Sequence, residues 1–214
     1  MKNRNWPRLI PALAATLLGL ASCTPNETQT LLEPSRAIGI VAAEEAARLA
    51  GARKQVALIL PDASWGPASS VEEALRAGLK KQGCSIVVAK SADLGDPMRR
   101  GQVGLKSADF FEALDKAVGA GAVVSLAGAP LLRQDEATRL RPDHPPVLVV
   151  ATASLGNLIG VTGDPSRLTG LLEARIIQLA IVDGAAESAT PPSGKADATH
   201  QLFSQHYHIL RGAE

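Results

Sequence analysis

Gln55-Val56-Ala57-Leu58-Ile59-Leu60 is an unbroken apolar run with β-branched residues, the pattern of a strand buried on both faces of a sheet. Three more runs repeat it, at Ser85–Ala89, Ala122–Leu126 and Val147–Ala151, and Leu158–Thr162 is predicted as a fifth, shorter strand. Runs that stay apolar without alternating indicate parallel strands with helices on either side. These runs therefore decide the fold class.

Segments with helical periodicity lie between the runs. Arg36–Leu49 is alanine-rich with helical spacing, and Ser70-Val71-Glu72-Glu73 reads as a capping box that opens a helix ending at Gly83. Ser107–Val118 is the next predicted helix. Asp164 followed by Pro165 predicts an N-cap, with apolar residues at helical spacing as far as Asp183.

Strands alternating with helices predict a single doubly wound, mostly parallel sheet of four to five strands with helices on both faces. This α/β domain is expected over residues 36–184, and 150 or so residues are enough for one well-buried core. Residues 185–214 are predicted to be a Pro/Ser/Gly-rich linker followed by apolar residues, Leu202–Leu210, that dock on the domain.

The N-terminus has the composition of an export signal. Residues 1–8 carry three basic side chains and no acid, and the apolar run Leu9–Ala21 follows. This run is 13 residues long, whereas a membrane-spanning helix needs about 20. Leu20-Ala21-Ser22-Cys23 resembles the lipobox of bacterial lipoproteins, which implies removal of residues 1–22 and diacylation of Cys23. The alternative is an ordinary signal peptide with an incidental cysteine.

Lipidation implies a protein held at the cell envelope. Two or more acyl chains hold a protein stably on a membrane, whereas one binds marginally. Residues 23–35 are polar and contain Pro25 and Pro34, a composition that predicts a flexible tether. Thr24 is not aspartate, so by resemblance to the sorting rule of enteric bacteria we expect the periplasmic face of the outer membrane.

Charge and cysteine content narrow the function further. Without residues 1–22 the chain has 19 basic and 21 acidic residues, a net charge near −2, and no basic cluster. Nucleic acid is therefore not an expected partner. Lipidation of Cys23 leaves Cys84 without a disulfide partner, and Cys84 is predicted to be a small buried hydrophobe.

The order of elements resembles the second lobe of type I periplasmic binding proteins and their repressor relatives, which is a flavodoxin-like sheet. The matching parts at the start are Ala42–Leu49, Val56–Leu60, Ser64–Ser70 and Val71–Gly83. Those at the end are Val147–Ala151, Leu158–Thr162 and Pro165–Asp183. The resemblance covers about 150 residues and is one of pattern rather than of a specific motif.

Two positions depart from the sugar-binding members of that family. Val71 stands where they have a ligand-contacting arginine, and Ala127-Gly128-Ala129-Pro130 stands where an Asn-Asp pair commonly follows the third strand. The first lobe, which closes over ligand, has no counterpart here. The resemblance therefore implies a binding module, and gives little support to carbohydrate transport.

In an open parallel sheet, ligands bind at the carboxyl ends of the strands near the topological switch point. The loop after the first predicted strand is the most polar one there and contains an aromatic residue. The candidate ligand-binding residues are Asp62, Ser64, Trp65, Ser69 and Ser70, with Ser154 from the loop after the fourth strand. The alternative is that Ser69 and Ser70 only cap a helix and Asp62 only ends a strand.

No set of residues in the sequence forms a nucleophile, a base and an orienting group. His206 and His208 lie without cysteine or carboxylate neighbours, so no metal and no cofactor is expected. The sequence favours a non-enzymatic module that binds a small molecule or an envelope protein, with a homodimer as one arrangement. The alternatives are an enzyme on a flavodoxin-like sheet and a structural envelope scaffold.

Overall fold

The computed structural model describes residues 27–62, 67–95, 103–155, 164–184 and 198–212, and the predicted strand Leu158–Thr162 lies outside them. The chain divides into two compact units, Met1–Leu31 and Leu32–Glu214. The second unit contains a sheet built from β1 (Gln55–Pro61), β2 (Ser85–Ala92), β4 (Ala122–Ser125), β6 (Val147–Ala151), β7 (Leu179–Asp183) and β8 (Tyr207–Arg211). Two short strands, β3 (Leu105–Lys106) and β5 (Pro130–Leu131), pair separately.

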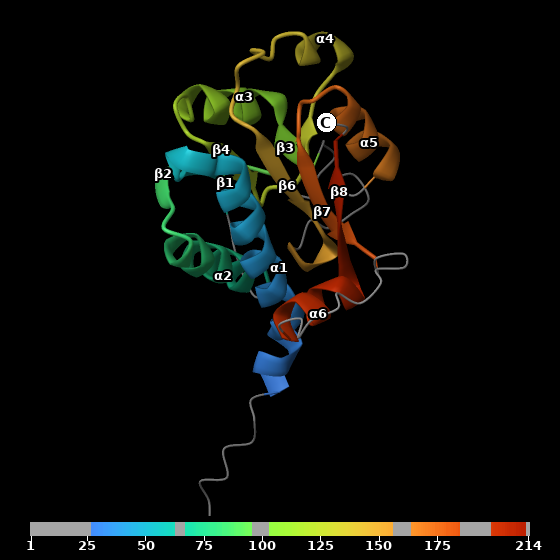
Figure 1. The fold of residues 1–214 in the computed structure, drawn as a ribbon. Helices are drawn as coiled ribbons and strands as arrows, with labels where there is room; N and C mark the ends of the chain where they lie inside the picture. The colour runs from blue at the N-terminus through green and yellow to red at the C-terminus, as the bar shows by residue number, and fades with distance from the viewer. Residues whose placement is uncertain (1–26, 63–66, 96–102, 156–163, 185–197, 213–214) are drawn as a thin grey trace, which may run out of the picture. The chain divides into compact units, whose positions relative to one another are not determined.

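The helices are α1 (Glu27–Ala50), α2 (Pro67–Lys81), α3 (Ser107–Lys116), α4 (Gln134–Ala137), α5 (Pro165–Glu173) and α6 (Ala198–His206). Short 3-10 helices occupy Gly51–Arg53 and Ala153–Leu155. Figure 1 shows the sheet with these helices around it. No helix within the described ranges has the length and apolar character needed to cross a membrane.

The sheet has the order β2-β1-β4-β6-β7-β8, and every neighbouring pair is parallel except β7 and β8. Its first five strands follow the flavodoxin-like order, in which the second strand lies outside the first. The predicted doubly wound, mostly parallel sheet is confirmed, with six strands instead of four to five.

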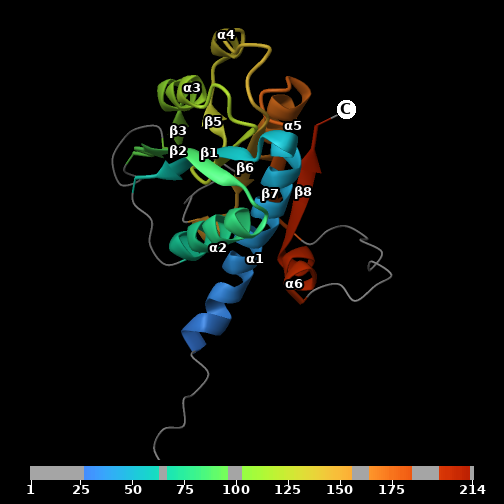
Figure 2. The same cartoon turned by 60° about the vertical axis from the view of Figure 1, so that its left-hand side comes forward.

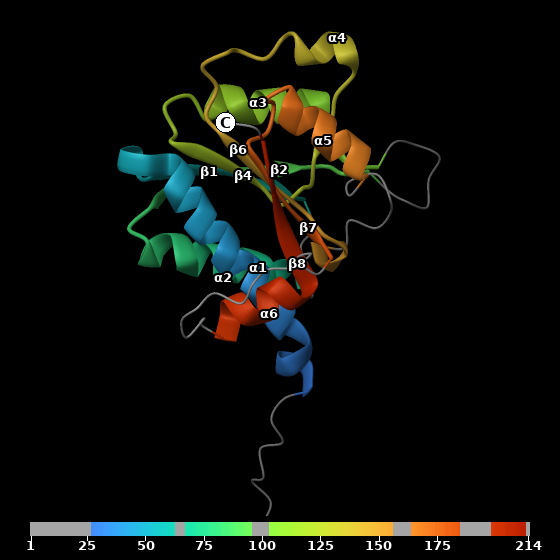
Figure 3. The ribbon, with the colours of Figure 1, turned by 45° about the vertical axis from the view of Figure 1, so that its right-hand side comes forward.

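Helices cover both faces of this sheet, as the uninterrupted apolar runs require. Side chains of α1, α2 and α6 share one core with alternate residues of the strands, including Leu58, Val124 and Leu148. Side chains of α3 and α5 share a second core with the intervening residues, such as Ile59 and Val123. The two layers are seen from different sides in Figures 2 and 3.

Close contact between α1 and α2 depends on two glycines. A Cβ on Gly39 of α1 would lie 2.7 Å from the Cβ of Ala74 and 2.8 Å from the backbone nitrogen of Leu75. A Cβ on Gly78 of α2 would lie 2.6 Å from the Cβ of Ala43. Real Cβ atoms do not approach neighbours this closely, so Gly39 packs against the backbone of α2 and Gly78 against the methyl group of Ala43.

The predicted helix from Pro165 to Asp183 is wrong in its second half. Asp164 caps the helix, its side chain accepting from the backbone nitrogen of Ser166 at 3.0 Å, but α5 ends at Glu173. The backbone nitrogen of Ile176 then bonds to Leu171 at 2.9 Å and that of Arg175 to Leu172 at 3.0 Å, which is a Schellman motif. Leu179–Asp183 is β7, which pairs with β6.

The end of α5 lacks the usual glycine signal. Arg175 has the left-handed backbone conformation, with φ of 55°, at the position where glycine is normally found. The sequence has no glycine or other signal at this stop. The helical spacing of Ile176 and Leu179 therefore predicts a helix that continues too far. These residues are buried in the cores on the faces of the sheet instead.

Two helix starts also differ from the prediction. Ser70 is not an N-cap, because α2 already begins at Pro67, a residue suited to the first helical position. α1 begins at Glu27, so residues 27–35 are helical where a flexible tether was expected, and Ser35 is buried. Pro34 lies inside this helix, and burial of the following Ala37 and Ile38 outweighs the polar composition of the segment.

The C-terminal segment adds β8 as an antiparallel edge strand beside β7. The carboxylate of Glu45 in α1 holds this strand, because it accepts hydrogen bonds from two nitrogens of Arg211, at 2.7 and 3.2 Å. The same carboxylate also accepts a hydrogen bond from Arg48 at 2.9 Å. Burial alone raises the pKa of Glu45, but the bonds and charges of Arg211 and Arg48 outweigh it and leave that pKa below its ordinary value.

A matched pair of glycine substitutions tests the α1–α2 contact. Gly39→Ala should lower the free energy of unfolding by about 1–3 kcal/mol, because the new Cβ overlaps α2. Gly170→Ala, in α5 where a Cβ meets nothing within 4 Å, should raise it by up to about 1 kcal/mol. Urea denaturation measures both values, and equal effects would contradict the close contact.

Candidate functional site

The switch point of the sheet lies between β1 and β4, because β1 has β2 on one side and β4 on the other. At this edge, called the carboxyl edge below, the chain leaves β1 at Asp62, β4 at Leu126 and β6 at Thr152. The ends of these neighbouring strands meet here, as the sheet order requires. Open α/β sheets bind ligands at such an edge.

The candidate residues are only partly within the described chain. Asp62 is exposed at the end of β1, and its backbone nitrogen donates to the carbonyl of Ala92 at 3.0 Å. Ser69 and Ser70 are half-buried in the first turn of α2. Ser154 lies in the 3-10 helix after β6, which contacts α2, so these two segments are brought together. Ser64 and Trp65 lie outside the described residues.

The loop after β4 contributes backbone rather than polar side chains. Residues 126–130 are all buried. The hydroxyl of Ser125 donates to the carbonyl of Gly128 at 2.7 Å, and Gly128 has φ of 80°, so the chain turns tightly there. This loop faces inward, and no charged side chain follows β4 directly.

Thr152 is a residue of this edge that sequence reasoning missed. Its residue exposure is 2%, and its Oγ1 has no hydrogen-bond partner in the part of the chain that the structure describes. A buried hydroxyl without a partner costs free energy, so such groups are uncommon in folded proteins. The only available signal was a polar residue directly after a fully buried strand. The next backbone nitrogen, of Ala153, donates to Asp183 at 2.7 Å.

Charged side chains lie along one side of the carboxyl edge. Lys106 donates to Asp93 at 2.9 Å, and this bond raises the pKa of Lys106, with further contributions from the charges of Asp109 and Asp62. The same bond lowers the pKa of Asp93. Lys106 also lines an open hollow of about 550 Å³ with Arg167, whose guanidinium donates to the carbonyl of Pro130.

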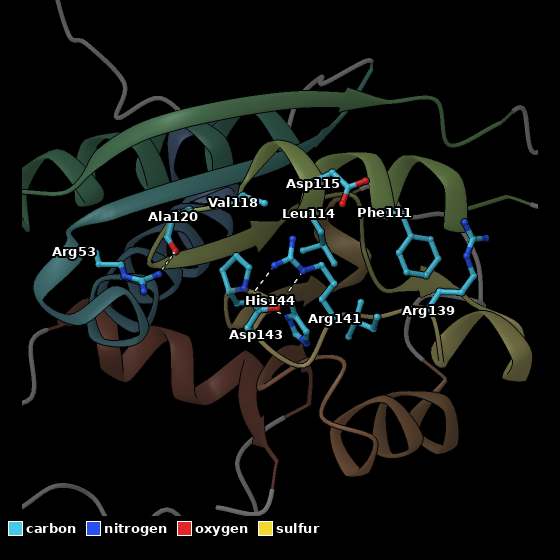
Figure 4. Close-up of a pocket in the computed structure, with 13 residues that line it drawn as sticks. Arg53, Phe111, Leu114, Asp115, Val118, Ala120, Arg139, Arg141, Asp143 and His144 are labelled. Atoms are coloured by element: carbon cyan, nitrogen blue, oxygen red, sulfur yellow. Dashed lines mark hydrogen bonds and ion pairs between the residues drawn. The ribbon is translucent and has the colours of Figure 1, made fainter.

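A more enclosed pocket lies at the opposite, amino edge of the sheet, where β4 and β6 begin. This amino-edge pocket has a volume of about 250 Å³. Its apolar surface comes from α3, the turn after it and the segment before β6, namely Phe111, Leu114, Val118, Ala120, Leu140 and Pro145. Figure 4 shows these side chains together with the charged residues around them.

Some charged residues of the amino-edge pocket pair with a residue of opposite charge, and others do not. Arg141 binds Asp143 through two bonds, of 2.9 and 3.1 Å, and these bonds hold the pKa of Asp143 below its ordinary value. Arg53 donates to the carbonyl of Ala120 at 3.1 Å, and Arg139 lies 5.1 Å from the ring centre of Phe111 (Figure 4). Within the described residues neither Arg53 nor Arg139 has a carboxylate partner.

His144 completes the rim of this pocket. Its Nδ1 lies 2.8 Å from the carbonyl oxygen of Pro145. A carbonyl only accepts, so Nδ1 carries the proton in the neutral ring and Nε2 is the acceptor. No nucleophile is bonded to this ring in the described chain, and the buried thiol of Cys84 is elsewhere.

Metal ligands are not gathered anywhere in the described ranges. No group of three or more histidine, cysteine or acidic residues there is arranged to hold an ion. His206 ends α6 and His208 lies in β8, where its Nδ1 pairs with the carbonyl of Gly184 at 3.1 Å.

No protein family model matches the chain, and no curated protein matches it. Among solved structures, it is similar to a periplasmic ribose ABC transporter protein of Conexibacter woesei, with 16% identity and a TM-score of 0.45 over 69% of this chain and 45% of that one. A carbohydrate transporter solute-binding protein of Agrobacterium radiobacter, in complex with D-arabinose, gives 16% identity and 0.47 over 70% and 47%.

An ABC transporter substrate-binding protein of Desulfitobacterium hafniense, in complex with leucine, gives 15% identity and a TM-score of 0.36 over 76% of this chain and 38% of that one. The chain thus spans less than half the length of each of these proteins. The ligands named for these structures are ligands of those proteins and do not identify a ligand of this chain.

Two hydroxyl deletions test the assignment of Thr152. Thr152→Val should raise the free energy of unfolding by about 1 kcal/mol, because it removes a buried hydroxyl that has no partner among the described residues. Ser125→Ala should lower it by about 1–2 kcal/mol, because it breaks the bond to Gly128. Chemical denaturation of both variants measures the difference. A loss of stability in Thr152→Val would show that the hydroxyl is bonded.

Proposed function

We propose that this chain is a lipid-anchored envelope protein whose α/β domain is a non-enzymatic module for binding a small ligand or a partner at its carboxyl edge. The observation that carries the proposal is the sheet order, which brings the ends of β1, β4 and β6 together at the switch point. Thr152 lies at the same edge, and its buried hydroxyl has no hydrogen-bond partner among the described residues.

The polar contacts of this site are proposed to come from two segments. Asp62, Ser64 and Trp65 follow β1, and Ser69 and Ser70 lie in the first turn of α2, whose free N–H groups favour polar or anionic atoms. Ser154 comes from the 3-10 helix that contacts α2. In this arrangement Trp65 is the apolar wall, and the serines with Asp62 orient the ligand.

A site on the open carboxyl edge of one sheet leaves a ligand more open to solvent than most pockets do, since pockets bury about 70% or more of a ligand. We propose that α6 supplies part of the cover. β8 starts opposite Asp183 at the carboxyl end of β7, so α6, which precedes it, lies at that same edge. We propose that a second copy or an envelope protein supplies the remainder.

The anchor is proposed to be a diacylated Cys23 on the periplasmic face of the outer membrane. The basic residues 1–8, the apolar run and Leu20-Ala21-Ser22-Cys23 support it. We propose 1–22 as the signal peptide and a domain that begins with α1. In this arrangement the acyl chains on Cys23 hold the domain at the membrane surface.

Cys23→Ser should abolish incorporation of labelled palmitate and leave the protein in the soluble or unprocessed fraction, because the acceptor thiol is gone. Cys84→Ser is the matched control and should incorporate label normally, since that thiol is buried in the folded domain. Metabolic labelling in the producing cell measures both. Palmitate in the Cys23→Ser protein would contradict lipidation at this position.

A thermal-shift screen of the processed protein against metabolites should identify a ligand. At 100 times its dissociation constant such a ligand adds about 2.7 kcal/mol of stability. Trp65 is the only tryptophan after residue 22, so its emission should change on binding. Trp65→Ala should weaken binding more than tenfold, about 1.4 kcal/mol.

The control for this variant is Val118→Ala, at the opposite edge of the sheet, which should leave affinity unchanged. If Trp65→Ala binds as tightly as the parent, the ligand does not use the carboxyl-edge loop. Weaker binding in Val118→Ala alone would place that ligand in the amino-edge pocket.

A further inference from the structure

The amino-edge pocket combines an apolar interior with cations that have no acidic partner. Its floor is made by Leu114, Ala120 and Pro145, all of them buried. At about 250 Å³ it holds far more than one water, whose share of liquid volume is about 30 Å³, and somewhat less than a drug-sized ligand. A compact ligand of one ring or a short branched chain fits this size.

Val118 adds to the apolar surface of this pocket. It is 66% exposed and is the more exposed of the two large hydrophobic side chains found at the surface of the described residues. The other, Val87, lies on the edge strand β2. Val118 lines the mouth of the pocket (Figure 4), where a bound apolar group would remove it from water.

The charged side chains that line the pocket favour an anionic group at the polar end of such a ligand. Asp143 is already bonded twice by Arg141, so that pair is electrically satisfied. Asp115 contributes one negative charge, whereas Arg53 and Arg139 contribute two positive charges without an acidic partner in the described chain. The lining therefore carries one net positive charge.

Arg53 is the better placed of the two free cations. Arg139 uses the face of its guanidinium on the ring of Phe111, at 5.1 Å. Arg53 uses one nitrogen to bond the carbonyl of Ala120, a floor residue, which fixes its position while its other N–H groups remain available. A guanidinium held in this way binds a carboxylate through a charge-assisted bond.

We propose that the amino-edge pocket is a second binding site, for a small apolar carboxylate whose acidic group pairs with Arg53 and whose body contacts Leu114, Val118 and Pro145. This site is separate from the proposed carboxyl-edge site, and the test of one site does not decide the other. Binding is predicted to weaken as the ionic strength rises, because the pocket is open to solvent on one side.

The test uses benzoate as the probe and benzamide as a match of nearly equal size without charge. Isothermal titration of the purified chain should show benzoate binding at least fivefold more tightly than benzamide. Arg53→Gln should weaken benzoate binding at least fivefold and leave benzamide binding unchanged. Arg36→Gln is the matched control, since it removes an exposed arginine of α1 that is not among the residues lining the pocket.

A second variant adds a negative charge to the same pocket. Val118→Asp places a carboxylate at the mouth of the pocket on a side chain that is already exposed, so it should fold normally and repel benzoate. Equal affinities for benzoate and benzamide, no benzoate binding at millimolar concentration, or equal losses in Arg53→Gln and Arg36→Gln would each overturn the proposal.

Discussion

The close approach of α1 to α2 and to the sheet is the constraint on which the rest of the structure depends. Gly39 and Gly78 let the two helices pack closely, because neither has a side chain in the contact. At the far end of α1, a Cβ on Gly121 would lie 2.6 Å from the carbonyl oxygen of Ala50, so α1 also touches the start of β4 directly. These contacts hold α1 against both α2 and the segment that leads into β4, beside the switch point between β1 and β4.

The two edges of the sheet differ in chemistry because they are built from different kinds of segment. At the carboxyl edge, β4 runs into a tight turn at Gly128 and β6 into a short 3-10 helix, and the charged pair of Lys106 and Asp93 lies to one side. At the amino edge, the segment from α4 to β6 carries Arg139, Arg141 and Asp143 beside an apolar surface. The two proposed sites therefore present different chemistry.

The antiparallel strand β8 ties the C-terminal segment to the rest of the domain. It closes the β7 side of the sheet and is held to α1 by the pair of Glu45 and Arg211. His200 of α6 lies 2.7 Å from Glu44, one residue away along α1. These contacts hold α6 against α1 at the carboxyl edge.

The sequence by itself determined the features that depend on local pattern. The apolar runs became β1, β2, β4 and β6, and Asp164 with Pro165 opened α5 as its capping chemistry requires. These follow from residues close together in the chain, where burial on both faces or a free N–H group leaves little choice. The polarity of the loop after β1 likewise singled out Asp62 by local composition, and its role in a ligand site is a proposal.

Only the tertiary structure decided the features that depend on distant partners. Arg175 ends α5 in a conformation usually reserved for glycine, because the strand that follows must pair with β6. Tyr207–Arg211 becomes a strand because it pairs with β7, and Thr152 is buried although it is a polar residue at the end of a strand. The amino-edge pocket likewise joins Arg53, α3 and the segment before β6, which are far apart in the chain. Local propensities are worth tenths of a kcal/mol per residue, whereas burial of a large apolar side chain contributes about 1.5–3 kcal/mol, so packing decides wherever the two conflict.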